Sequence, residues 1–185
     1  MDLATIEKYI GQITALEFSA RDDEIATSSV SLIAEMGARG LLQSTITLSK
    51  FADFVNAEFS LRAELAAQYL LPRLSVITKS AAQEKQGDAV TLYKSLATEQ
   101  RIRLEACYDR FATPVTAALQ SSMPAQIREQ LLARMASTLK KHELVLEFEC
   151  ALAAGGQSKE ILTLRPSIYG IGVDLKELWS KIFGQ

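Results

Sequence analysis

Apolar side chains recur at intervals of three or four residues along most of the chain, a spacing typical of amphipathic helices. The row starts near the N-terminus with Leu3, Ile6, Ile10, Ile13 and Leu16. Glycine and proline interrupt the pattern at only a few places, which predicts long helices and short connections. Chains of this kind fold as antiparallel helical bundles. The sequence therefore predicts an all-α fold of long, kinked helices.

The first fifth of the chain contains two predicted boundaries. The acidic run at residues 22–24 suits the positive end of a helix dipole, so we expect a second helix to begin there and the first to be short. Further on, Gly37 and Gly40 each weaken a helix by about 1 kcal/mol relative to alanine. Either one helix runs through a crowded centre, or the chain turns at this "GARG" sequence. We predict the turn.

Three later helices are predicted, over residues 41–71, 88–121 and 124–154, and the first of them, or a successor to it, should continue past Pro72 to about Gln86. The apolar face of the first is too broad for a two-stranded seam, so this helix should be buried on more than one side. Pro72 removes a backbone hydrogen bond and predicts a kink or a helix end, and Pro114 predicts a kink in the last turns of its helix. We expect the bundle to span residues 1–156 and to stop at a pair of glycines.

The charge distribution argues against nucleic acid as the main partner. The chain carries 20 basic and 22 acidic residues, and the basic residues are spread along it instead of forming one patch. The N-terminus lacks the features of a secretory signal, and no stretch approaches the roughly 20 apolar residues of a membrane span. Segments 25–49 and 111–127 are poor in charge, but both contain several polar side chains. The expected location is the cytoplasm.

Few residues could support metal, haem or nucleophilic chemistry. One histidine, His142, and two cysteines, Cys107 and Cys150, do not provide the usual ligands of a dinuclear iron, haem or zinc site. A hairpin of the last two helices that turns near Ser122 places Cys107 opposite Thr138. His142 is then one helical turn away, so a Cys-His dyad is conceivable. The simpler interpretation is a core histidine and buried, inert thiols, with no catalytic residue, metal or cofactor.

The periodicity changes after the glycine pair at 155–156. Pro166 forbids a helix across it, and alternating apolar residues predict a short extended segment within residues 157–185. Asp174 and Glu177 then mark the start of a C-terminal amphipathic helix. A helix of about ten residues is marginal alone in water, so its apolar face must be buried against something. The predicted partner-binding residues of this tail are Tyr169, Ile171, Val173, Leu175, Leu178, Trp179, Ile182 and Phe183.

These features predict a non-enzymatic protein-interaction or assembly module, an adaptor, regulator or oligomer subunit that acts through the tail. Aromatic anchors beside an extended segment are a recurring recognition form, and we expect the partner to be a second copy of the chain or a different protein. The tail could instead fold back on its own bundle. Two other functions stay open at this point. One is a membrane-active protein that inserts residues 25–49 or the tail into lipid, and the other is an enzyme that uses the Cys107 and His142 pair.

Overall fold

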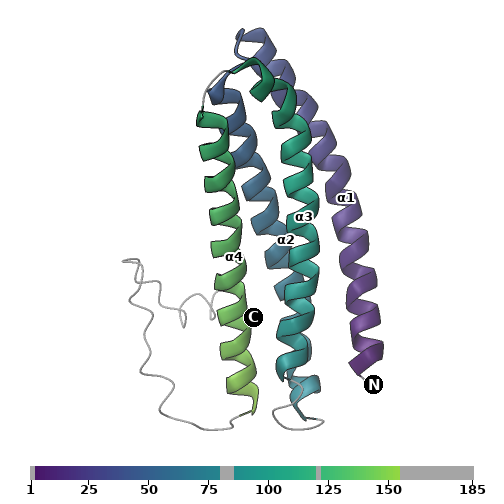
Figure 1. The fold of residues 1–185 in the computed structure, drawn as a ribbon. Helices are drawn as coiled ribbons and strands as arrows, with labels where there is room; N and C mark the ends of the chain where they lie inside the picture. The colour runs from purple at the N-terminus through teal and green to yellow at the C-terminus, as the bar shows by residue number, and fades with distance from the viewer. Residues whose placement is uncertain (1–2, 80–85, 120–121, 155–185) are drawn as a thin grey trace, which may run out of the picture. The chain divides into compact units, whose positions relative to one another are not determined.

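The computed structural model describes residues 3–79, 86–119 and 122–154, and the regular secondary structure of these residues is entirely α-helical. In chain order, the helices are α1 (Leu3–Ala38), α2 (Thr45–Lys79), α3 (Gln86–Ala118) and α4 (Met123–Ala154). Successive helices run in opposite directions and form an antiparallel four-helix bundle (Figure 1). The predicted all-α fold is confirmed.

The chain divides into two units, Met1–Ala154 and Gly155–Gln185. The helices described above make up the first unit. The extended segment and the C-terminal helix predicted within residues 157–185 lie outside the described residues. Their structure stays a prediction.

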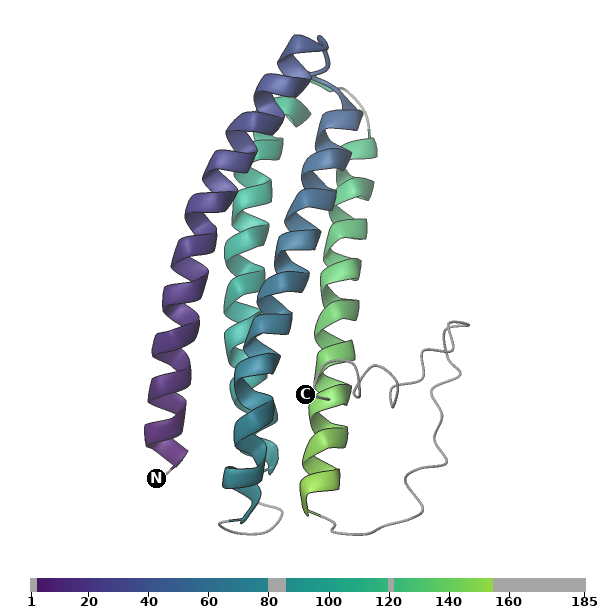
Figure 2. The ribbon, with the colours of Figure 1, turned by 180° about the vertical axis from the view of Figure 1, so that it is seen from behind.

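Helix α2 is the central element of the bundle. It packs against each of the other three helices, whereas α1 packs chiefly against α2 (Figure 2). A helix with three neighbours needs apolar side chains on several sides, which explains the broad apolar face of its sequence. The predicted burial on more than one side is confirmed. The large buried apolar side chains of α2 are Leu48, Phe51, Val55, Phe59 and Leu70.

Two clusters of buried side chains fill the interior. The first includes Phe51 of α2, whose ring stacks on Phe111 of α3 with 3.8 Å between the ring centroids. The second lies further along α2 and includes Ile10, Tyr93 and Leu146 from the other three helices. Polar side chains separate the two clusters along the bundle, and they form the ionic network described below.

Helix α1 is continuous, so the prediction of a short first helix and a second start at residues 22–24 is wrong. The acidic residues there do not cap a helix, because Asp22 binds a side chain of α2 instead. The predicted apolar row also drifts off the buried face. Ile10 is buried, but Leu16 is 74% exposed, and the buried row continues through Thr14 and Phe18. Thr14 tolerates burial because its hydroxyl donates to the carbonyl of Ile10 at 2.8 Å.

The predicted turn at Gly37–Gly40 is confirmed. Helix α1 ends at Ala38, and Gly40 has a φ of 67°, the left-handed conformation that favours glycine. The amide of Leu41 donates to the carbonyl of Met36 at 2.8 Å, as in a Schellman motif. Ser44 then caps α2, because its hydroxyl oxygen accepts a hydrogen bond from the Thr47 amide at 3.2 Å. The turn therefore pairs many of its own polar groups.

Both prolines lie inside helices. Helix α2 continues past Pro72 to Lys79, so Pro72 does not end it. Pro114 lies in the last two turns of α3, and these turns bend away from the axis of the rest of the helix in Figure 1. A proline at this position cannot donate to the carbonyl of Arg110 and crowds it, which accounts for the bend.

Gly11 in α1 and Gly40 in the turn after it provide a matched test of the backbone. Gly40→Ala should destabilise the protein by about 1 kcal/mol, because alanine adopts a positive φ poorly although nothing lies within 4 Å of the added methyl group. Gly11→Ala should stabilise it by up to about 1 kcal/mol, because Gly11 is helical and its added methyl group also meets nothing within 4 Å. Urea denaturation measures both, and equal shifts of the same sign would contradict the assigned turn.

Candidate functional site

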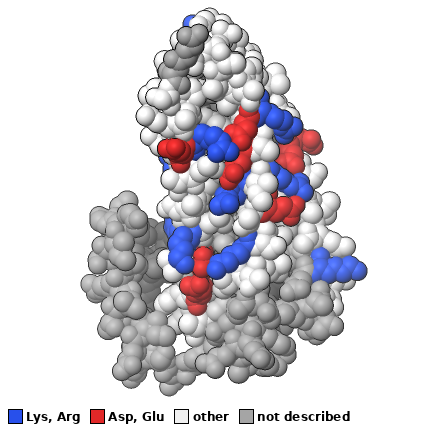
Figure 3. Space-filling view, viewed as in Figure 1, with Lys and Arg blue, Asp and Glu red and all other residues white. Residues whose placement is uncertain are grey.

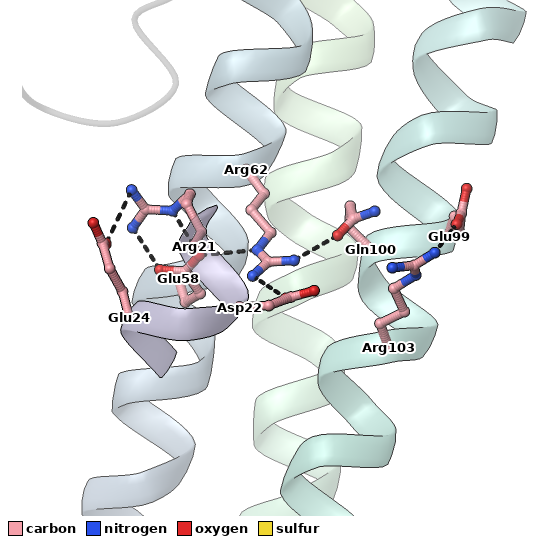
Figure 4. Close-up of polar contacts among 8 residues, drawn as sticks. All are labelled: Arg21, Asp22, Glu24, Glu58, Arg62, Glu99, Gln100 and Arg103. Carbon is pink, nitrogen blue, oxygen red and sulfur yellow. Dashed lines mark hydrogen bonds and ion pairs between the residues drawn. The ribbon is translucent and has the colours of Figure 1, made fainter. Parts of the chain in front are cut away.

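A fully buried arginine joins three helices near the middle of the bundle. Arg62 of α2 is 0% exposed in its side chain. Its Nε donates to Glu58 at 2.9 Å, its Nη1 to Gln100 of α3 at 2.6 Å, and its Nη2 to Asp22 of α1 at 2.6 Å (Figure 4). Its guanidinium also lies 5.6 Å from the ring centroid of Phe18. One side chain of α2 thus fixes α1 and α3 at the same level.

A second arginine completes this network. Arg21 of α1 donates to both carboxylate oxygens of Glu58, at 2.6 and 2.5 Å. Burial raises the pKa of Glu58, but the hydrogen bonds and charges of Arg21 and Arg62 outweigh burial and hold the pKa below its ordinary value. The network has no net charge, because the two positive charges of Arg21 and Arg62 equal the two negative charges of Glu58 and Asp22. We refer to Arg21, Asp22, Glu58, Arg62 and Gln100 as the ionic network.

A groove between α1 and α3 opens beside the network. It encloses about 550 Å³, and its walls include Ile25 and Ala26 of α1 and Leu104 and Cys107 of α3. A smaller hollow of about 170 Å³ lies between the same two helices, and Asp22 lines both. The groove is consistent with the packing of α1, which lies chiefly on α2 and makes few contacts with α3. Its lining is mixed in polarity and is suited to binding more than to a defined reaction.

The structure does not bring Cys107 and His142 together, so the Cys-His dyad that the sequence left conceivable is not formed. The ring of His142 lies 6.2 Å from that of Tyr93, which precedes Cys107 by 14 positions on α3. At 1.5 Å per residue, this offset is about 21 Å along the helix. The observed register differs from the predicted one, because Tyr93 and Lys94 of α3 lie opposite His142 and Glu143 of α4, whereas the predicted turn near Ser122 would place them opposite residues near 151 and 152.

The environments of these residues also fit structural roles. Burial raises the pKa of the Cys107 thiol, which disfavours the reactive thiolate. Burial lowers the pKa of half-buried His142. Cys107 and Cys150 are thiols and are not joined in a disulfide. Within the described residues, no group of three or more histidine, cysteine, aspartate or glutamate side chains could hold a metal ion.

The predicted partner-binding residues lie outside the described residues, so the structure does not place them. They are Tyr169, Ile171, Val173, Leu175, Leu178, Trp179, Ile182 and Phe183. The helix that precedes them has an apolar surface of its own, which the sequence analysis missed. Four large apolar side chains of α4 are 41–52% exposed on one face, and we call them the α4 patch: Leu144, Val145, Phe148 and Leu152.

The sequence analysis also missed Arg62 and Glu58. The signal was present, because these opposite charges are spaced i,i+4 on the apolar face that contains Val55, Phe59 and Ala66. Charges at such positions must be paired if the face is buried. Their partners on α1 and α3 are about 40 residues away in the sequence, and no local pattern indicates them.

Comparison of the chain with protein-family models, with curated proteins and with solved structures gave no match in any of the three. None of the described helices is both long enough and apolar enough to cross a bilayer. The functional argument therefore rests on the surfaces and the chemistry of this chain.

Removal of the buried guanidinium should strongly destabilise the protein. Arg62→Met should cost about 3 kcal/mol, because it leaves the Glu58 carboxylate and the Gln100 amide buried with fewer partners. The matched control is Arg103→Met, since Arg103 pairs with Glu99 at the surface and should change stability by less than about 0.5 kcal/mol. Urea denaturation of both variants measures the difference. Equal stabilities would show that the network does not hold the helices together.

Proposed function

We propose that this protein is a non-enzymatic assembly module that binds another protein chain through its C-terminal part. The α4 patch carries the proposal. Its four large apolar side chains are exposed on the last described helix, and surfaces of this kind mark interaction sites. The tail that follows in the sequence contains the aromatic and aliphatic residues predicted to bind a partner. The α4 patch and the apolar residues of the tail are thus close to each other in the sequence.

The charged side chains of the bundle support a protein partner over nucleic acid. Nucleic-acid binding needs basic side chains that are available to phosphates. In the described bundle, several arginines instead form ion pairs between helices. These pairs are Arg21 with Glu58, Arg62 with Asp22, Arg128 with Asp109 and Arg134 with Asp53.

The remaining chemistry supports a role in binding. The acids of the ionic network are held by arginines, and Cys107 and His142 lie far apart along α3 and α4. The two thiols are consistent with the reducing cytoplasm, where we place the protein. The proposed partner is a second copy of the chain or a different protein in that compartment.

Charge on the apolar face of the tail should weaken assembly. In the full chain, Trp179→Glu combined with Ile182→Glu should lower the association state, because glutamate on that face opposes burial against a partner. Ser180→Glu is the matched control, since Ser180 is predicted to lie on the polar face of the same helix. Light scattering gives the mass of each variant. If the double variant and the control both have the wild-type mass, the tail is not the contact between copies.

A further inference from the structure

The fold joins two segments of low charge at one end of the bundle. We call this end the tip and define it as residues 30–49, 111–119 and 122–127. The α1–α2 turn, the end of α3 and the start of α4 lie there (Figure 1). The charged residues of the tip are Glu35 and Arg39, and they pair with each other at 2.9 Å. Figure 3 shows that charged side chains gather further along the bundle and are sparse at this end.

Large apolar side chains are exposed at the tip. They come from α1, the α1–α2 turn, α2 and the start of α4, and each is between 40% and 66% exposed: Val30, Ile33, Leu42, Ile46 and Met123. Single exposed apolar residues are common, whereas several at one end of low charge make that end a candidate for an interaction surface.

Backbone polar groups in the α1–α2 turn already have hydrogen-bond partners within the protein. Polar groups removed from water need partners inside the protein. In the α1–α2 turn, the Leu41 amide donates to Met36, and the Leu41 carbonyl accepts from the hydroxyls of Ser44 and Thr47. A partner that covers this turn therefore removes these groups from water at little cost.

Paired charges surround the tip. The pairs join neighbouring helices: Lys50 with Glu35 at 3.4 Å, Arg128 with Asp109 at 2.8 Å, and Arg134 with Asp53 at 2.6 Å. An apolar centre inside a polar rim is the usual composition of a protein interface. Glu35 pairs with both Arg39 and Lys50, so the named charges of the tip and its rim leave an excess of one positive charge, and a second identical tip meets little repulsion.

We propose that the tip is a contact surface for a second copy of this chain, separate from the tail. Most homodimers use the same patch on both subunits, which requires a patch that tolerates its own charges. The tip meets this requirement, since Glu35 and Arg39 neutralise each other. A lipid surface fits less well. The tip contains no tryptophan or tyrosine, and the nearby lysine and arginines are paired with acids instead of facing anionic headgroups.

The test places like charges at the tip of the full chain. Val30→Glu combined with Ile46→Glu should weaken self-association at least about 100-fold, because both residues are exposed and two tips would then oppose four carboxylates. Glutamate also suits position 46 in the first turn of α2, so folding should be retained. Ile102→Glu is the matched control, since Ile102 is 58% exposed on α3 outside the tip, and it should keep the wild-type association.

Mixing variants identifies the contact as one between copies. The lysine pair, Val30→Lys with Ile46→Lys, should also be dissociated alone, and an equimolar mixture with the glutamate pair should associate again. Sedimentation velocity measures each sample. Wild-type association in the glutamate pair overturns the proposal, whatever the tail variants do. Binding of the wild-type chain to phosphatidylcholine and phosphatidylserine vesicles that is lost in the glutamate pair also overturns it, because the tip would then be a lipid contact.

Discussion

The hydrogen bonds of Arg62 are the constraint on which the arrangement of the helices depends. A buried guanidinium must satisfy its donors, and it does so through acceptors on its own helix, on α1 and on α3. This requirement fixes the level of all three helices at the point where two apolar clusters meet. It matters most for α1, which packs chiefly on α2 and buries a single narrow row of side chains. Apolar packing alone would leave its rotation and level weakly specified, whereas Arg21 and Asp22 on α1 set both.

The position of α1 that these hydrogen bonds set also shapes the surface of the bundle. Because α1 is held on α2, it does not close against α3, and the groove between them remains open. At the tip, the chain reverses direction between α1 and α2 at the turn around Gly40, and this turn lies at the same end of the bundle as the end of α3 and the start of α4. Helix α4 runs from the tip toward the opposite end, and the α4 patch lies in its second half. The α4 patch and the tip are the two apolar surfaces on which the proposed assembly role rests.

Local features of the fold could be predicted from the sequence, and features that depend on distant partners could not. The spacing of apolar residues indicated the helices, and the glycines at 37 and 40 indicated the turn, because both depend on neighbouring residues. The acidic run at residues 22–24 was misinterpreted as a helix start, since its partner Arg62 is 40 positions away. Cys107 and His142 lie apart because Tyr93, and not Cys107, lies at the level of His142, and no local pattern sets the offset between two helices. The low charge of segments 25–49 and 111–127 was visible, but only the fold shows that they meet.

The most direct measurement is sedimentation equilibrium of the unmodified full chain over a wide range of concentration. The chain has a mass of 20.3 kDa. If the protein is an assembly module, its mass should rise with concentration to at least twice this value, since two separate surfaces are available for contact. A mass of 20.3 kDa at every concentration up to the solubility limit would contradict self-assembly through either surface.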